Sequence, residues 1–309
     1  MVLAIGHNST WQKTYRIGSL QRGEVNRIDS AEAFASGKGA NVVRALACLG
    51  VEGLLLGYAG GANGLRFRRA LEQEGLRFEL QEIEGETRIC TTILEQDRTT
   101  TELIEPSPAV LEQERAAFLR LCRAWICEAE LLIISGTSLP GEAETCYRDN
   151  ILEAKRRGVP VLLDSFRSHG RLALSAGPQI LKINLRELEA LCGRSLESLE
   201  ERKEAYRGLR ENYGLRWVAI TMGARGMEGF DGSRFLQAEP PEVACLNPIG
   251  SGDAAAAGVA LCFYRGQDLA EALLSATALG SANCLNLKPG LILMEQYEEL
   301  RRRVSLRPL

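Results

Sequence analysis

The sequence predicts an α/β protein with a mostly parallel central sheet. From about Glu128 onward, short β-branched runs alternate with longer amphipathic ones, which is the pattern of successive βαβ units. The chain has 309 residues and is 45% hydrophobic, enough to bury a large core. No low-complexity tract and no long linker of proline and glycine divides it, so we expect a single domain over residues 1–309.

The elements of this repeating part follow from the two periodicities. Strands are predicted at Leu131–Ser135, 159–164, Ile180–Asn184 and Trp217–Thr221. The amphipathic runs predict helices at 142–157, Leu185–Cys192, 196–213, 252–265 and 269–285. Gly158 and Gly214 directly follow two of these helices, where a left-handed cap residue is favoured.

The first third of the chain interrupts this rhythm. Residues 87–96 and 99–106 predict two strands joined by a tight turn at Asp97–Arg98. We expect this stretch, 87–106, to form a small sheet together with residues 13–28. Such a sheet would stand off the main body as a lid and exclude water from a bound ligand.

Composition excludes several classes of protein. A net charge of −3 argues against a protein that acts mainly on nucleic acid or on an anionic membrane, and favours a small polar ligand. The longest apolar run is far too short to span a bilayer, and the first residues lack a basic leader, so we expect a cytoplasmic protein. The nine cysteines form no CxxC pair, and two histidines cannot build a histidine-rich metal site.

The strongest local signal is the run NPIGSGD, residues 247–253, followed by AAAAG. A glycine-rich turn (Gly250, Ser251, Gly252) that leads into a helix exposes backbone N–H groups at the positive end of the helix dipole, where phosphate oxygens bind. Asp253 in the first turn is placed to accept the proton of an attacking hydroxyl. The alternative interpretation is a simple capping aspartate.

Three further segments place polar groups where parallel sheets bind ligands. Gly37, Lys38 and Gly39 precede Asn41 and a predicted helix, although the pattern of a Walker A loop is absent. Asn184 and Glu187 follow one predicted strand, and Thr221, Gly223 and Gly226 follow another. Each segment alone is equally typical of an ordinary loop or helix cap.

In their order along the chain, these motifs resemble those of the ribokinase/PfkB family of carbohydrate kinases. Residues 36–41 match the N-terminal GGKGxN signature, and 250–253 match the C-terminal GAGD signature with serine in place of alanine. Residues 184–187 match NxxE, and 221–226 match T/S-x-G-x-x-G. GEVNR at 23–27, GETR at 85–88 and SGTSLPG at 135–141 are similar to the branch of 1-phosphofructokinase and tagatose-6-phosphate kinase.

The resemblance implies a three-layer α/β/α sandwich, ATP and Mg²⁺, and a role for each matching residue. Asp253 would be the base, and Gly250, Ser251 and Gly252 the anion hole. Asn184 and Glu187 would place the ATP phosphates and Mg²⁺, mostly through water, and the nucleotide would be lined by Thr221, Gly223, Gly226 and Asn283. Gly37, Lys38 and Asn41 would hold the sugar, and a phosphate already on it would be bound by Arg27, Lys38 and Arg88.

The match departs from the family at the sugar end. Gln12 stands where relatives of this branch carry a sugar-binding aspartate, which changes a charged acceptor into a neutral amide. Cys90 stands where many have asparagine. These differences indicate altered sugar selection on unchanged phosphotransfer machinery.

The leading hypothesis is a kinase of a ketohexose monophosphate, such as a fructose or tagatose phosphate. A kinase of an unphosphorylated sugar or nucleoside is the alternative, and a non-catalytic sugar or nucleotide sensor is a third. A dinucleotide-dependent dehydrogenase is disfavoured because no GxGxxG follows the first strand. Exposed strand edges in the lid lead us to expect a homodimer.

Overall fold

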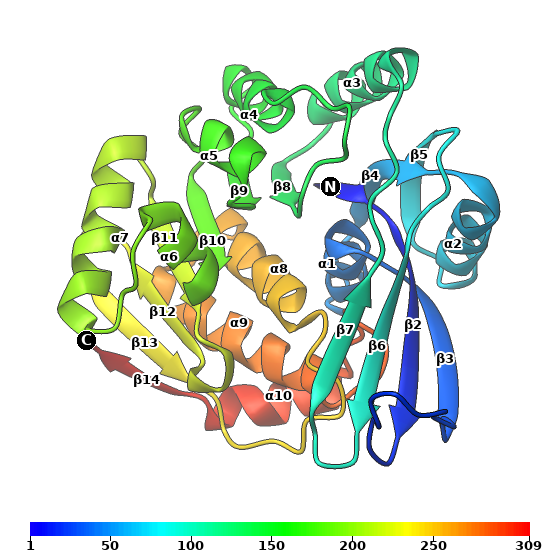
Figure 1. The fold of residues 1–309 in the computed structure, drawn as a ribbon. Helices are drawn as coiled ribbons and strands as arrows, with labels where there is room; N and C mark the ends of the chain where they lie inside the picture. Colours follow the sequence, from blue (N-terminus) through cyan, green and yellow to red (C-terminus); the bar gives the residue numbers. More distant parts are fainter.

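A computed structural model describes all residues, 1–309, and contains two sheets (Figure 1). The strands of the larger sheet are, in chain order, β1 (Val2–Asn8), β4 (Gly53–Ala59), β5 (Arg77–Glu82), β8 (Leu131–Ser135), β9 (Val161–Asp164), β10 (Ile180–Asn184), β11 (Trp217–Thr221), β12 (Met227–Phe230), β13 (Phe235–Glu239) and β14 (Ser305–Pro308). Their spatial order is β14-β13-β12-β11-β10-β9-β8-β1-β4-β5. Pairing is parallel from β5 to β11 and antiparallel from β11 to β14.

The parallel strands are buried on both faces, which explains their nearly continuous apolar sequences. Every residue of β1, β4 and β8 is buried, as expected for strands that are covered by helices on both sides. The predicted strands β8, β10 and β11 are confirmed, and β9 begins two residues later than predicted, at Val161. The prediction of a mostly parallel α/β sheet is therefore confirmed.

Helices cover both faces of this sheet and give three layers. One apolar core lies under α1 (Lys38–Cys48), α2 (Gly61–Gln73), α8 (Ser251–Tyr264), α9 (Leu269–Cys284) and α10 (Met294–Arg303). The other lies under α3 (Glu112–Ile126), α4 (Cys146–Arg156), α5 (Ser168–Leu174), α6 (Leu185–Cys192) and α7 (Leu199–Tyr213). The alanines of α8 are almost fully buried, because this helix packs closely against its neighbours.

Helix boundaries differ from prediction where local capping decides them. The predicted helix 196–213 begins at Leu199, because the Ser198 side chain accepts a hydrogen bond from the backbone N–H of Glu201 and forms a capping box. The predicted helix 142–157 begins at Cys146 instead. None of the helices combines the length and apolar character that crossing a bilayer requires.

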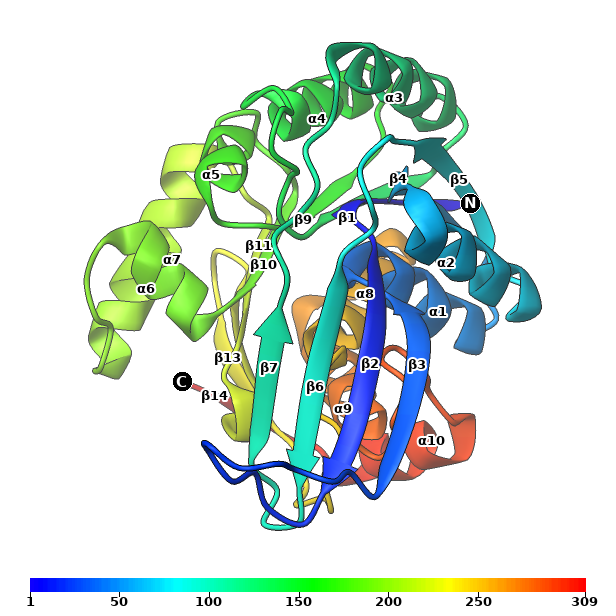
Figure 2. The ribbon, with the colours of Figure 1, turned by 45° about the vertical axis from the view of Figure 1, so that its right-hand side comes forward.

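The smaller sheet, which we call the lid, projects from one side of the body (Figure 2). Its strands are β2 (Thr10–Ile17), β3 (Ser30–Ser36), β6 (Ile89–Glu95) and β7 (Thr100–Ile104), in the order β3-β2-β6-β7. The predicted hairpin is present as β6 and β7, and Arg98 in its turn has a positive φ of 71°. The expectation for 13–28 was wrong in extent: β2 ends at Ile17, residues 18–29 form a loop, and β3 was not predicted.

Candidate active site

The candidate site lies where the carboxyl ends of β1, β8, β9 and β10 meet the first turns of α1 and α8. Parallel strands point their carboxyl ends to one edge of a sheet, and ligands of open α/β sheets bind there. In this protein the edge carries Asn8, Ser135, Asp164 and Asn184. Both glycine-containing motifs from the sequence reach this edge, although more than 200 residues separate them.

Asp253 occupies the first turn of α8 and is 6% exposed. Its Oδ2 accepts a hydrogen bond of 2.8 Å from Nδ2 of Asn41. Burial raises the pKa of Asp253 to about 6, and nearby Asp164 adds to this rise, while Lys38, Lys182 and the Asn41 hydrogen bond oppose it. A carboxylate with a pKa just below neutrality, and with one oxygen held by Asn41, is suited to accept a proton from a hydroxyl.

Gly250, Ser251 and Gly252 form the turn into α8. Gly250 has a φ of 88°, and a Cβ there would lie 2.8 Å from Pro289 Cβ and 2.9 Å from Gly290 N, so only glycine fits. The first amides of a helix have no acceptor within it and point outward at the positive end of its dipole. Ser251 N donates to Pro248 O at 3.3 Å, so an anionic phosphoryl group beside the Asp253 carboxylate would be stabilised by the other N–H groups at this helix start.

Asn283, which the resemblance placed beside the nucleotide, supports this turn from inside the protein. Its side chain is fully buried on α9. Nδ2 donates to Ile249 O at 2.8 Å and to Ser251 Oγ at 3.0 Å, and Oδ1 accepts from Gly290 N at 2.7 Å. Because every polar group of the amide is engaged inside the protein, Asn283 is a positioning residue for the anion-hole turn.

The Lys38 side chain lies near two carboxylates, and its contact with Asp164 was not predicted from the sequence. Its Nζ lies 3.0 Å from Asp164 Oδ1 and 3.8 Å from Glu187 Oε1. Burial works against the charge of Lys38, but the carboxylates of Asp164 and Glu187 outweigh it and raise its pKa. Lys38 is thus paired with carboxylates in this structure, and its predicted contact with a substrate phosphate stays a prediction.

Asp164 is the centre of this charged group and is completely buried at the end of β9. Its Oδ2 accepts from Ser135 Oγ at 3.1 Å and lies 3.4 Å from Lys182 Nζ. Although burial favours the neutral acid, the ammonium groups of Lys182 and Lys38 hold the pKa of Asp164 below its usual value. One feature of the sequence could have predicted a buried acidic partner such as Asp164. Lys182 lies inside the apolar run LKIN, and a buried lysine requires a partner.

Asn184 and Glu187 form a capping box at the start of α6. Asn184 Oδ1 accepts from Glu187 N, and Glu187 Oε2 accepts from Asn184 N, both at 2.9 Å. The second carboxylate oxygen of Glu187 faces Lys38. The motif therefore has a structural role in capping and also presents one carboxylate oxygen to the candidate site.

Thr221, Gly223 and Gly226 follow β11, next to Asn184 in the sheet. Thr221 is the register partner of Asn184. Gly223 has a φ of 61° and open space where a Cβ would be, whereas a Cβ on Gly226, with a φ of 82°, would collide with Ala238 O. Gly226 is thus required by the backbone, while Gly223 leaves room for a ligand beside the strand end.

Gly37 of the N-terminal signature lies against the end of β1. Gly37 has a φ of 108°, and a Cβ would lie 2.4 Å from Asn8 O. Asn8 Nδ2 donates to Thr137 Oγ1 at 2.8 Å and so holds the loop after β8. Gly136 in that loop adjoins the Lys38 side chain. The segments around Asn8, Gly37 and Thr137 therefore enclose one corner of the site.

Gln12 lies on the buried face of the lid and is 3% exposed. Its Nε2 donates to Thr92 Oγ1 at 2.8 Å and to Lys13 O at 3.3 Å. Cys90, its register partner on β6, is also buried. Since the NH₂ group is occupied, Gln12 has only its Oε1 to offer a ligand.

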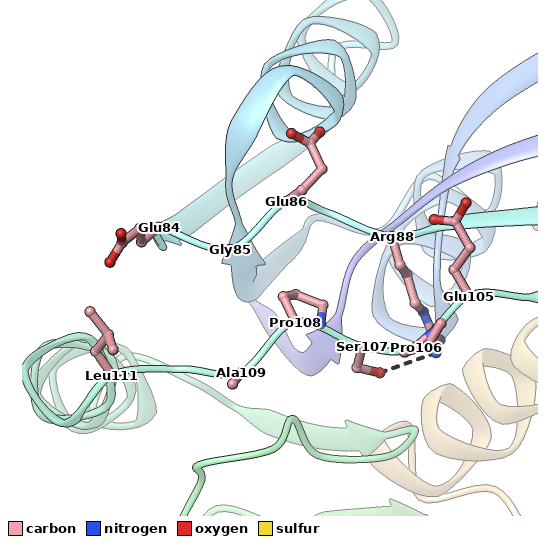
Figure 3. A pocket seen from close by; sticks show the side chains of 10 residues that line it. All are labelled: Glu84, Gly85, Glu86, Arg88, Glu105, Pro106, Ser107, Pro108, Ala109 and Leu111. Atoms are coloured by element: carbon pink, nitrogen blue, oxygen red, sulfur yellow. Dashed lines mark hydrogen bonds between the residues drawn. The ribbon is translucent and has the colours of Figure 1, made fainter.

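Arg88 lines a cleft of about 560 Å³ at the base of the lid (Figure 3). Its Nε donates to Thr10 Oγ1 at 3.3 Å and its Nη1 to Ser107 Oγ at 3.2 Å. No carboxylate lies within ion-pair distance of this guanidinium, and the nearby Glu86 and Glu105 instead accept from backbone N–H groups. Arg88 is therefore an unpaired cation next to β2, able to bind an anion.

Within one chain, Arg27 is not near Arg88, its partner in the predicted phosphate cluster. Arg27 is exposed in the loop 18–29 that follows β2, whereas Arg88 precedes β6. β2 and β6 run in parallel from the pair Trp11–Ile89 to the pair Ile17–Glu95. At about 3.3 Å per residue, this places the two arginines roughly 20 Å apart, at opposite ends of the lid.

Comparison with known proteins identifies the family. The model of the pfkB family carbohydrate kinases matches residues 1–294. The chain belongs to the PfkB family. This PfkB protein is therefore a carbohydrate kinase that transfers a phosphoryl group to a hydroxyl, and kinases of its family use ATP as the donor. The residues of the candidate site all lie within the matched range.

Solved structures show the same fold as this PfkB protein. Phosphofructokinase-2 from Escherichia coli in complex with substrates and products has a TM-score of 0.90 at 23% identity, over 98% of each chain. A possible 1-phosphofructokinase from Thermotoga maritima gives 0.89 at 22% identity, over 100% of this chain and 99% of that one. Arabidopsis thaliana ribokinase complexed with ribose and ATP gives 0.76 at 20% identity, over 97% and 98%. The prediction of a ribokinase-like fold is thus confirmed.

Proposed function

We propose that this PfkB protein phosphorylates a hydroxyl of a ketohexose monophosphate, such as a fructose or tagatose phosphate, with Asp253 as base. The observation that carries the proposal is the Asp253 carboxylate, buried beside the N–H groups of the Gly250–Gly252 turn. One of its oxygens is held by Asn41, and the other is left for the substrate hydroxyl. The base and the anion hole would thus act on the same transferred group.

The proposed reaction assigns one task to Asp253 and another to the groups around it. The substrate hydroxyl would donate its proton to Asp253 as its oxygen attacks the γ-phosphorus of ATP. The turn amides and the Lys38 ammonium would stabilise the charge on the phosphoryl group in transit. The lid would exclude water, which is the competing acceptor.

Magnesium would accompany ATP rather than occupy a cage of its own. No group of three or more histidine, cysteine or acidic side chains is arranged to hold a metal. Glu187 presents one carboxylate oxygen at the site, which fits a contact to Mg²⁺ through water, because Mg²⁺ usually keeps several waters and binds substrate phosphates. The ion would neutralise phosphate charge when bound.

Arg88 supports a substrate that already carries a phosphate. Its guanidinium has no acidic partner and lies beside Thr10 and Ser107, two hydroxyls that phosphate oxygens also accept from. Phosphofructokinase-2 from Escherichia coli in complex with fructose-6-phosphate is among the similar folds. These two facts favour a phosphorylated ketose.

A kinase of an unphosphorylated sugar is the second candidate, and one observation favours it. Within one chain, Arg27 lies far from Arg88, and Lys38 is paired with carboxylates. Of the three residues predicted to bind a substrate phosphate, only Arg88 is then free to do so. A neutral sugar would require no cluster at all.

ADP release from Mg-ATP decides between these candidates. The acceptors are fructose 6-phosphate, fructose 1-phosphate, tagatose 6-phosphate, free hexoses and nucleosides, each tested with the protein and with Asp253→Asn. We expect turnover on a phosphorylated ketose that is lost in the variant. Turnover on neutral sugars alone would reject the phosphate role of Arg88, and equal turnover in Asp253→Asn would reject the proposed base.

We also propose that two copies pair through the lid. The apolar side chains of Val25, Ile28, Leu103 and Ile104 are exposed there, by 83%, 44%, 59% and 58%. β7 and β3 are edge strands with free backbone groups, which favour strand pairing. Light scattering during gel filtration tests this, and replacement of Leu103 by lysine would leave a monomer.

A further inference from the structure

The side-chain amide of Asn41 lies between a hydrogen-bond acceptor and two hydrogen-bond donors. On one side, Nδ2 donates to Asp253 Oδ2 over 2.8 Å. On the other, Oδ1 lies 3.1 Å from Ser36 Oγ and 3.2 Å from Arg44 Nη1. Asn41 is 2% exposed, so water does not compete for these bonds.

The Asn41 amide could point either its oxygen or its NH₂ group toward Arg44, and the chemistry of Arg44 favours only one of these orientations. Guanidinium is a donor only, and it remains charged in proteins, so an NH₂ group cannot face it favourably. The Asn41 oxygen must therefore point to Arg44. This leaves the NH₂ group to face Asp253, where it stabilises the carboxylate.

Arg44 is itself fixed. Its side chain is 3% exposed. Nη1 donates to Pro289 O at 2.6 Å, Nη2 donates to Ala35 O at 2.7 Å, and Nε lies 2.5 Å from Glu74 Oε2. With contacts to the end of β3, the last turn of α2 and the 288–290 turn, the guanidinium has little freedom to leave Asn41.

We propose that Arg44 is a positioning residue that holds the Asn41 amide with its NH₂ group toward Asp253 and so keeps the base ionised and aligned. The inference rests on the proposed function in that it takes Asp253 as the base. If the amide turned over, its oxygen would face the carboxylate. That contact is favourable only when Asp253 is protonated, and a protonated Asp253 cannot accept the substrate proton.

Three other charged groups face Asp253, and none of them is a hydrogen-bond partner of Arg44. They are Lys38 on α1, Asp164 on β9 and Lys182 on β10. The charge of Arg44 is compensated by Glu74 at 2.5 Å. Loss of Arg44 therefore acts on Asp253 through the orientation of Asn41.

The test is a carbon-13 NMR titration of the aspartate carboxyls. Asp253 is one of seven aspartates, and its signal is identified by its absence in Asp253→Asn. We expect Arg44→Gln to move the Asp253 titration upward by about one pH unit, and the acid limb of kcat/KM with it, which is roughly a tenfold loss of activity below both midpoints. In an Asn41→Ala background, Arg44→Gln should cause no further movement.

Two outcomes would overturn the proposal. One is an Asp253 titration midpoint that Arg44→Gln leaves unchanged. The other is an upward shift of this midpoint that is as large in the Asn41→Ala background as it is when Asn41 is present. If Arg44→Gln does not fold, Arg44→Lys replaces it: one ammonium cannot satisfy Glu74, Pro289 O and Asn41 together, so a smaller upward shift is expected, and no shift overturns the proposal.

Arg202→Gln is the matched control. Arg202 is also a buried arginine, with Nε 3.0 Å and Nη2 2.9 Å from the Glu228 carboxylate, but it lies on α7. Its loss should lower stability and leave the Asp253 midpoint in place. Since the titration requires no turnover, it tests the role of Arg44 even if the chain phosphorylates none of the sugars tried, and a positive sugar assay with an unmoved midpoint rejects the role of Arg44 alone.

Discussion

Asn41 Nδ2 and Asp253 Oδ2 are joined by a 2.8 Å hydrogen bond between residues 212 positions apart in the chain. The bond links the first turns of α1 and α8, which carry the two glycine-containing signatures of the sequence. Neither signature is a complete site alone. The N-terminal one supplies the donor that holds Asp253, and the C-terminal one supplies the proposed base and the proposed anion hole.

Replacement of Asp253 by asparagine should abolish catalysis without destabilising the fold. We expect kcat to fall by about 10²–10⁴. The pKa of this carboxyl is raised from 3.8 to about 6, so the folded state binds its proton more tightly than the unfolded state does. The ionised carboxylate therefore costs stability above pH 6, and the variant should gain up to about 3 kcal/mol at pH 8 but little near pH 4. Urea unfolding at both pH values measures this, and a variant less stable at pH 8 would contradict it.

The same pKa predicts the pH dependence of the reaction. Below pH 6, Asp253 is protonated and cannot accept the hydroxyl proton, so kcat/KM should fall about tenfold per pH unit. The measurement is kcat/KM from pH 5 to 8 at saturating Mg-ATP. A kcat/KM that stays constant from pH 8 down to pH 5 would contradict a base with this raised pKa.

Replacement of Asn283 by alanine should damage both stability and catalysis. The change removes three hydrogen bonds and leaves Ile249 O and Gly290 N without their partner, at a cost of about 2–4 kcal/mol. Because the anion-hole turn loosens, kcat should fall while KM for ATP changes little. Asn150→Ala, at another buried asparagine, is the control and should affect stability alone. If the main effect were instead a rise in KM for ATP, Asn283 would be assigned to the lining of the nucleotide site.

Replacement of Arg88 by alanine should raise KM for a phosphorylated sugar by about 10–100-fold, the value of a charge-assisted contact, and leave KM for ATP unchanged. Arg27→Ala is the informative comparison, because Arg27 lies at the opposite end of the lid. A small effect is expected if each chain binds its substrate alone. An effect as large as that of Arg88→Ala would mean that Arg27 reaches the pocket of a second copy.

Cys284 should be the cysteine whose modification inactivates the enzyme. A hydrogen bond from Cys245 and another with Ser251 lower the pKa of Cys284, against its burial. Its Sγ lies 3.2 Å from Ser251 Oγ, next to the anion hole. Alkylation by iodoacetamide at pH 8 should inactivate the protein, Cys284→Ala should resist, and Mg-ATP should protect. Equal inactivation of Cys284→Ala would point to another thiol.

The sequence allowed prediction of the elements but not of the contacts between them. Three strands and α6 were predicted with their observed limits, because short buried strands carry continuous apolar runs and α6 has its own cap. β3 was missed, since its first four residues are exposed and give no alternating pattern. Lid strands depend on their partners in the sheet, and a single sequence does not state those partners.

The site residues divide in the same way. Asp253 and Asn41 lie within local motifs, so their chemistry could be anticipated. Arg44 and Pro289 lie outside the recognised motifs, and their contact, 2.6 Å from Nη1 to the carbonyl oxygen, spans 245 positions. Arg27 shows the opposite case: a motif gave its identity, but only the parallel register of β2 and β6 gave its position relative to Arg88.

The distance in sequence between Asn41 and Asp253 also has a consequence during synthesis. A ribosome adds about 5–20 residues per second, so α1 leaves the exit tunnel about 10–40 s before α8. During this interval the Asn41 and Arg44 side chains face solvent or a chaperone in place of their final partners. If Asp253 is the base, a nascent chain that ends before α8 has no group to accept the substrate proton, and phosphotransfer begins only after α8 has been made.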